Sequence, residues 1–179
     1  ICAACLQPFE ARKGTRRRHH FAHVSNYECM YASEVAIYKA IAEALKQSGF
    51  LTLPAVMLRF PAWHDPELLQ EARRLKIDSV AFECEPLSYP PLLRVTMQGT
   101  PLRILLDFDR YYDDDDRVEL AEEAKVEDYS LLLISMPKIE QDTEFTPDRL
   151  QSALQDNDRT EWVFSRLEEQ WKQKYYAVA

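Results

Sequence analysis

The sequence predicts a mixed α/β (α+β) protein, in which a sheet of mixed strand direction is flanked by helices. Three observations predict this class. Apolar residues recur at helical spacing early in the chain, short apolar or alternating runs typical of strands follow, and helical patterns return between and after them. The chain has 179 residues, of which 46% are hydrophobic and 29% charged, which suits one medium core and a small appendage.

The beginning of the chain carries a metal-binding pattern in place of an apolar core. Cys2 and Cys5 form a C-x₂-C pair, and His20 and His23 form an H-x₂-H pair. Two close pairs joined by a loop are the ligand set of a tetrahedral structural zinc site. No hydrophobic run in residues 1–23 would otherwise hold this segment together, so we expect one structural zinc ion.

Two further residues are alternative ligands of the same ion. His19 adjoins the histidine pair, and Cys29 follows shortly after it. A thiolate binds zinc as well as an imidazole does, so Cys29 can replace a histidine. With either ligand set we expect a zinc-ribbon module over residues 1–32 and a separate core over residues 33–179.

Positive charge is concentrated in the same module. The net charge is −8 overall but +3 for residues 1–33, so the remainder carries −11. The basic side chains are Arg12, Lys13, Arg16, Arg17 and Arg18. A basic loop beside a metal-bound turn can contact phosphates, and DNA is therefore its expected partner. The alternative is a solvated loop that only keeps the module soluble.

The first predicted helix covers residues 34–47. Ser33 is a candidate N-cap, and Glu34 lies in the first turn, where the helix dipole favours negative charge. Gly49 is expected to end the helix. The apolar residues at helical spacing predict one buried face, made of Val35, Tyr38, Ile41, Ala42 and Leu45.

The residues after this helix are expected to be extended and then helical for a short stretch. Residues 50–60 have the pattern of extended chain with a break at Pro54, and 61–66 form a loop. Residues 67–75 are predicted as a short helix or helical turn. The strands that follow are predicted at residues 77–85, 92–97, 102–108 and 129–136, with a hairpin turn at 98–101.

The remaining helices are predicted around and after the last of these strands. A short helix is expected over residues 118–124, capped by an acidic loop made of Asp113 to Asp116. Adjacent aspartates cannot all face one ion without a sharp bend, and no glycine interrupts the run, so we do not expect a metal there. Another helix begins at Pro147, and a C-terminal helix includes Trp162 and runs to about residue 174.

Two aspartates at the end of the third strand are candidates for chemistry. The period of a strand puts Asp107 and Asp109 on the same face. Two carboxylates placed in this way can hold Mg²⁺ and position a water for phosphodiester cleavage. The alternative is a polar strand end, in which the carboxylates pair with Arg103 or Arg110.

The order of motifs in the first third of the chain resembles the competence protein CoiA-like family. The resemblance rests on C-x₂-C, Gly14, the run Arg-His-His-Phe-Ala-His, Cys29, and the pair Ser33-Glu34 that opens a helix. It implies a zinc ribbon followed by a restriction-endonuclease-like core of the PD-(D/E)xK type. Such a core implies Mg²⁺-dependent cleavage of DNA, with Glu34, Asp107 and Asp109 at the catalytic positions.

The chain departs from the family's catalytic pattern at several of these positions. Tyr38 stands where a histidine is expected, residues 90–92 lack the expected acid, and Asp109 replaces a lysine. Without the first acid the ion loses an anionic ligand. A carboxylate in place of the lysine repels the scissile phosphate, by about 1–4 kcal/mol at ~4 Å. The resemblance therefore implies a degenerate site, with substitute acids and cations as the alternative. The candidates for that role are Asp78, Glu83, Glu85, Arg117 and Lys125.

Three functions follow from these observations. The first is a nuclease-fold protein that binds nucleic acid or a protein partner without hydrolysis, in DNA processing or phage defence. The second is an active Mg²⁺-dependent DNA nuclease, and the third is a non-enzymatic assembly subunit. No apolar run of about 18 residues is present, so no membrane span is expected. Cysteines in a metal pattern favour a reducing, cytoplasmic setting.

Overall fold

The computed structural model describes residues 1–2, 4–13, 20–24, 29, 31–59, 65–84, 90–108, 112–136 and 146–178. In these ranges the chain forms a five-stranded sheet, three two-stranded sheets and four α-helices. The predicted mixed α/β class is therefore confirmed. No helix among the described residues is long and apolar enough to cross a membrane.

The five-stranded sheet forms the centre of the molecule and has the strand order β11-β10-β9-β8-β7. Its strands are β7 (Ser79–Glu83), β8 (Leu92–Met97), β9 (Thr100–Phe108), β10 (Ser130–Met136) and β11 (Thr160–Phe164). Strands β7, β8 and β9 form an antiparallel meander, β10 is parallel to β9, and β11 is antiparallel to β10. Helix α2 (Asp114–Val126) makes the crossover that the parallel pair requires.

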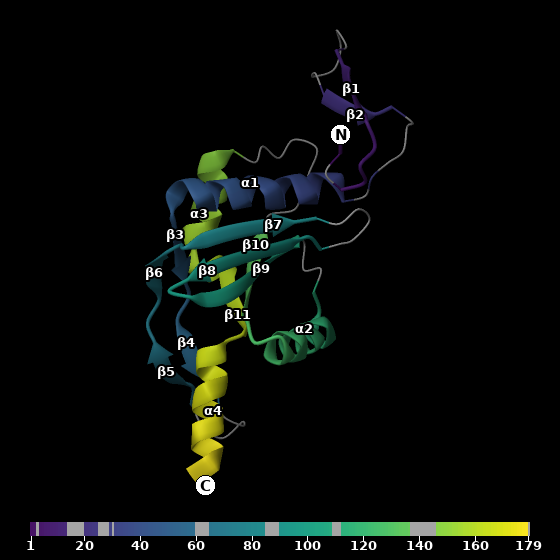
Figure 1. The fold of residues 1–179 in the computed structure, drawn as a ribbon. Helices are drawn as coiled ribbons and strands as arrows, with labels where there is room; N and C mark the ends of the chain where they lie inside the picture. The colour runs from purple at the N-terminus through teal and green to yellow at the C-terminus, as the bar shows by residue number, and fades with distance from the viewer. Residues whose placement is uncertain are drawn as a thin grey trace.

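Helices cover both faces of this sheet, which explains why β9 and β10 each carry a run of consecutive apolar residues. Ile104 and Leu106 of β9 pack on the face covered by α1 (Ala32–Ser48) and α3 (Pro147–Gln155), whereas Leu105 packs on the face covered by α2. Figure 1 shows α1 and α3 on one side of the sheet and α2 on the other. A strand buried on both faces loses the usual alternation of polar and apolar residues.

Helix α1 agrees closely with its prediction, except at its start. The predicted face is buried, and Gly49 ends the helix in the left-handed conformation with φ 67°. Ser33, however, lies inside the first turn. Tyr31 occupies the N-cap position without a side-chain hydrogen bond, and its carbonyl accepts from the Val35 N–H at 2.9 Å.

The short helix predicted over residues 67–75 is wrong, because two strands occupy this region. Strand β5 (Glu67–Gln70) pairs with β4 (Val56–Leu58), and β6 (Arg73–Lys76) pairs with β3 (Phe50–Leu53). Both segments are short and largely exposed, so the partner strand decided their conformation and local propensity did not. The extended prediction for residues 50–60 is confirmed at β3 and β4, with Pro54 between them.

Two helix boundaries also differ from the prediction. Helix α2 begins four residues early, at Asp114, because Asp113 accepts from the Asp116 N–H at 2.9 Å and forms a capping box with it. Trp162 does not belong to the C-terminal helix, because it lies in β11, which completes the sheet beside β10. The C-terminal helix α4 (Arg166–Val178) starts after that strand.

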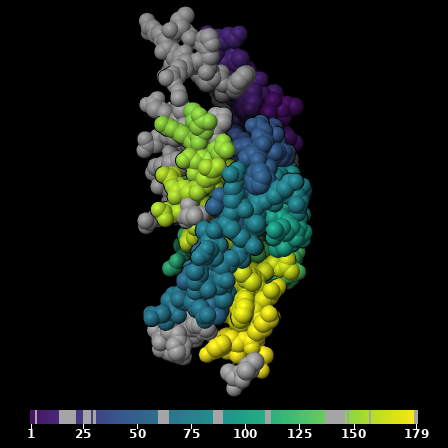
Figure 2. Space-filling model, turned by 90° about the vertical axis from the view of Figure 1, so that its left-hand side faces the viewer, coloured from purple at the N-terminus to yellow at the C-terminus, as the bar shows by residue number. Residues whose placement is uncertain are grey.

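The two ends of the chain lie at opposite ends of an elongated molecule. A hairpin of β1 (Phe9–Arg12) and β2 (His20–His23) projects beyond the first turn of α1 (Figure 1). Helix α4 projects from the other end of the body (Figure 2). Among the described residues, the N-terminal segment packs on the body near the start of α1 and the end of β7.

Candidate metal centre

Three thiols and one imidazole meet where the N-terminal hairpin joins the body. Cys2, Cys5, His23 and Cys29 each offer one ligand atom, and these four atoms lie within 4.8 Å of one another. Cys5 Sγ and His23 Nε2 are 3.2 Å apart. Ligand atoms about 3.3–3.8 Å apart surround a tetrahedral zinc ion with bonds of about 2.0–2.3 Å. A set of three thiolates and one imidazole fits structural zinc.

Local backbone structure presents these side chains to one point. The Cys2 N–H donates to the Gln7 carbonyl at 2.8 Å, and the Leu6 N–H donates to the Cys2 carbonyl at 3.0 Å. These bonds close the turn that carries the C-x₂-C pair, with Leu6 at φ 57°. His23 arrives from β2, where it pairs with Phe9 and lies 4.8 Å from its ring centroid.

The centre also belongs to a small apolar cluster shared with the body. Cys2 is fully buried, and it packs with Val35 in the first turn of α1. Phe82 of β7 and Cys84, just beyond β7, contact the same cluster. A metal bound here would therefore fix the hairpin to two elements of the body.

The thiols differ in how readily they ionise. Burial opposes ionisation of Cys2, but hydrogen bonds with the backbone of Ala4 and Cys5 and with His23 outweigh it and lower its pKa to about 7. Burial raises the pKa of Cys29 to about 11, and the neighbouring thiols act in the same direction. Zinc binds thiolates, so binding at neutral pH would release protons, chiefly from the less acidic thiols.

The structure brings together three of the four predicted zinc ligands and the alternative Cys29. The side chains of His20 and His19 lie outside the described residues. The expected H-x₂-H pair assumes a turn, whereas residues 20–23 form strand β2. Positions three apart in a strand lie on opposite faces, so the backbone here differs from the turn that the prediction assumed.

A second candidate site lies at the end of β9, where the resemblance implies catalytic acids. Glu34 and Tyr38 lie one turn apart on α1, and the Tyr38 Oη accepts from the Leu106 N–H at 2.8 Å. This bond joins the first turns of α1 to the strand end that carries Asp107. Asp107 is only 3% exposed, and one Glu34 carboxylate oxygen is buried without a hydrogen-bond partner among the described residues.

Among the described residues, these acids are not grouped as the ligands of a metal ion. Asp109 lies outside the described residues. In the described part of the chain, only the Cys/His cluster brings three or more possible ligands together. Burial raises the pKa of Tyr38, which stands where the resemblance implies a histidine. Tyr38 therefore stays neutral and serves as a structural link between α1 and β9.

The proposed substitute residues are engaged elsewhere. Arg117 Nη1 lies 2.6 Å from Glu161, and Lys125 Nζ lies 3.0 Å from Glu169. Asp78 accepts from the Gly99 N–H at 3.0 Å. Glu83 lies 3.3 Å from Arg94. Glu85, another proposed substitute, lies outside the described residues. These contacts give no support to relocated catalytic groups.

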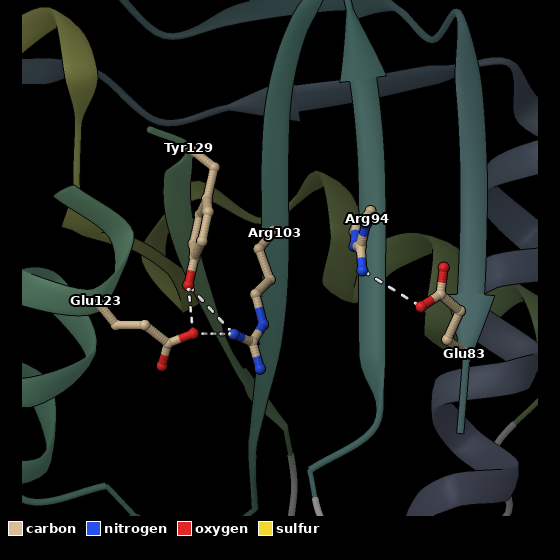
Figure 3. A network of polar contacts seen from close by, with 5 residues as sticks. All are labelled: Glu83, Arg94, Arg103, Glu123 and Tyr129. Atoms are coloured by element: carbon tan, nitrogen blue, oxygen red, sulfur yellow. Dashed lines mark hydrogen bonds and ion pairs between the residues drawn. The ribbon is translucent and has the colours of Figure 1, made fainter. Parts of the chain in front are cut away.

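Arg103, which was one proposed partner of the strand-end aspartates, has a different set of contacts. Its Nη1 donates to Glu123 at 2.8 Å and to the Tyr129 hydroxyl at 3.1 Å, and that hydroxyl donates to Glu123 at 3.0 Å. Figure 3 shows this triangle between β9 and α2, with the separate pair Arg94 and Glu83 across β8 and β7. Arg103 thus fastens α2 to the sheet.

The basic residues of the module lie partly within the described structure. Arg12 ends β1 and is exposed, as is Lys13, and the Arg12 Nε lies 2.9 Å from Glu10. Arg16, Arg17 and Arg18 lie outside the described residues. The register pairs Phe9 with His23 and Arg12 with the first residue of β2, so the basic end of the hairpin is the end away from the metal centre.

Comparison with known proteins supports the N-terminal assignment. Residues 1–32 match the family model for the N-terminal domain of competence protein CoiA. The match covers all four clustered ligands and ends at the first residue of α1. No curated protein and no solved structure matched the chain. The predicted resemblance is therefore confirmed for the N-terminal segment.

Proposed function

We propose that this protein is a competence-related DNA-binding protein, in which a zinc-built ribbon over residues 1–32 presents basic side chains beside a core over residues 33–179 without hydrolytic activity. The observation that carries the proposal is the position of the metal cluster at the base of the β1–β2 hairpin. A strand rises about 3.3 Å per residue, which puts Arg12 about 10 Å further from the cluster than Phe9.

The distribution of charge supports the same surface. The ribbon and its junction carry +3 and the rest of the chain −11, so the body repels a polyanion and the hairpin attracts it. Arg12 and Lys13 are exposed at the basic end of the hairpin, and by sequence three more arginines follow before β2. DNA approaching this molecule would therefore meet the hairpin first.

Salt dependence of DNA binding tests this surface. We expect the slope of log K against log salt to become less negative by about 1.8 in the double variant Arg12→Ala/Lys13→Ala, because each phosphate contact contributes about −0.9. The double variant Arg74→Ala/Lys76→Ala removes the same charge from exposed positions on β6 and is the matched control. Equal losses in both variants, or binding that ignores salt, would contradict a hairpin interface.

The absence of hydrolysis is proposed from the second candidate site. Glu34 and Asp107 lie at the same end of the sheet, but within the described structure no third acid joins them and the candidate cations are paired elsewhere. A Mg²⁺ nuclease needs ligands for the ion and a group that orients the attacking water. In this proposal the ribbon binds DNA, and the core supports the ribbon or binds a protein partner.

A cleavage assay separates this proposal from an active nuclease. The buried Asp107 and the buried carboxylate oxygen of Glu34 are the observations that favour a nuclease. Plasmid DNA is incubated with the protein and Mg²⁺ or Mn²⁺, and we expect no metal-dependent nicking above the background. Nicking by the wild type that disappears in both Glu34→Ala and Asp107→Ala, but persists in the exposed-site control Glu43→Ala, would establish the nuclease instead.

A further inference from the structure

A cavity of about 280 Å³ lies between the central sheet, the β3–β6 pair and helix α4. It includes Leu102 at the start of β9 and Ser130 at the start of β10, so it lies at the end of the sheet opposite Asp107. The elements that surround it meet on the side of the body away from the hairpin (Figure 1). Ligand sites usually have volumes of about 300–1,000 Å³, so this cavity suits a small ligand.

The walls of the cavity combine apolar surface with neutral hydrogen-bonding groups. Leu75, Met97 and Trp162 contribute apolar surface, and the Trp162 indole N–H donates to the Pro54 carbonyl at 3.2 Å, which fixes the ring. Three amide side chains, Gln70, Gln98 and Gln170, also line the cavity. Each amide can both donate and accept, which matches a heterocycle that carries both kinds of group.

The charge of the lining is positive, although the chain as a whole is acidic. Arg73 and Arg166 line the cavity, and no Asp or Glu is among its described lining residues. Arg166 already makes a two-pronged pair with Asp128, at 2.9 and 3.0 Å. Arg73 contacts the Gln70 amide and takes part in none of the ion pairs found between described residues. A guanidinium in this setting favours an oxyanion, which it can bind with two parallel hydrogen bonds.

We infer that this cavity binds a nucleotide, with the base between the apolar walls and the glutamines and the phosphate at Arg73. Inorganic phosphate would leave the apolar walls and amides unused, and an apolar molecule would leave Arg73 unused. A free mononucleotide and the 5′-terminal nucleotide of a nucleic acid present the same groups. The inference does not depend on the ribbon, because no described residue of the ribbon lines the cavity.

Isothermal titration of the zinc-loaded full chain tests this inference. The probes are AMP, GMP, CMP and UMP, with adenosine and inorganic phosphate as partial ligands. We expect saturable one-to-one binding of at least one mononucleotide, and binding about tenfold weaker in Arg73→Ala, because a charge-assisted pair to phosphate is lost. Arg74→Ala is the matched control, since its guanidinium lies 4.6 Å from the Phe50 ring and does not line the cavity.

A 5′-phosphorylated hexanucleotide distinguishes the two sources. Binding of the oligonucleotide that Arg73→Ala weakens and AMP competes away assigns the site to a nucleic-acid end, and binding of mononucleotides alone assigns it to free nucleotides. Either result supports the site. Three results would overturn it: no saturable binding at millimolar nucleotide, inorganic phosphate binding as tightly as every nucleotide, or equal weakening in Arg73→Ala and Arg74→Ala. The hairpin variants leave this readout unchanged, so failure here and failure of the DNA surface are separable.

Discussion

The N-terminal ribbon and the central sheet are held together by different forces. Strand β1 is exposed at all four positions, and the buried side chains of the ribbon include the candidate ligands Cys2, Cys5 and His23. In β10, by contrast, Leu131 to Ile134 are all fully buried between helices. We therefore expect the ribbon to depend on a bound metal for its stability, whereas the sheet depends on burial of apolar surface.

The two regions nevertheless meet in an apolar cluster among the described residues. Phe82 of β7 packs against both the cluster around the ligands and the main core of the sheet. Val35 holds the first turn of α1 against Cys2. Loss of structure in one region can therefore spread into the other, and the extent of this spread can be measured.

Removal of the metal is expected to have the largest effect. We expect one zinc ion per chain and, after chelation, loss of amide-exchange protection in β2 and around Cys2 and Cys5, while β9 and β10 remain protected. Structural zinc contributes about 10–16 kcal/mol to such small modules, and the ribbon has no core to replace it. Metal analysis and hydrogen exchange measure the two quantities. If β9 loses protection as well, the Phe82 contact makes the regions one folding unit.

Two single variants identify the fourth ligand within the same experiment. Cys29→Ala should release the zinc at a far lower chelator concentration than wild type, because it removes a thiolate from the cluster. His20→Ala is the matched comparison, and we expect it to retain the ion. The reverse ranking would restore the ligand pair predicted from the sequence.

A cavity in the sheet should have the next largest effect, confined to the body. Leu133→Ala removes a fully buried side chain from β10, and we expect the free energy of unfolding to fall by about 2–5 kcal/mol. Chemical denaturation measures this change, and the zinc content should stay the same. Leu68→Ala, at a position 50% exposed on β5, is the control and should change stability little. Loss of zinc in Leu133→Ala would show that the sheet supports the metal centre.

A smaller effect is expected at the start of α2. Asp113→Ala removes the side chain that accepts from the Asp116 N–H, and we expect a loss of about 1 kcal/mol in unfolding free energy. Thermal or denaturant unfolding monitors the change. Asp114→Ala, which removes a neighbouring charge but not the cap, is the comparison. Equal effects of the two variants would assign the loss to helix-dipole charge and not to capping.

The smallest effect is a pH dependence at the contact between α2 and α4. A hydrogen bond from Lys125 holds the pKa of Glu169 below its ordinary value of 4.5. A carboxylate with a lowered folded pKa stabilises the protein above the ordinary value, and this contribution disappears as the pH falls through the folded value. Glu169→Gln should therefore lose less stability than Asp113→Ala at pH 7, and its difference from wild type should shrink below about pH 4.5. A difference that does not change with pH would exclude this pair as its source.

The sequence predicted the long apolar elements well. The strand 92–97 was predicted with the same limits as β8, and the predicted helix 34–47 lies within α1. Such elements are long and periodic, so local sequence already contains the burial pattern that the fold uses. The segments 67–75 and 162–164 were misassigned because they are short and take their conformation from a neighbouring strand.

The same division applies to the metal centre. By itself the sequence determined that candidate metal ligands gather near the N-terminus, because thiols and imidazoles at close spacing are rare in a segment without a core. It also identified three of the four residues that cluster in the structure. Only the tertiary structure decided that Cys29 completes the set and that the set packs on Val35 and Phe82. Ligand choice depends on where a strand directs its side chains and where the chain returns to the ion. Spacing along the sequence does not contain that information.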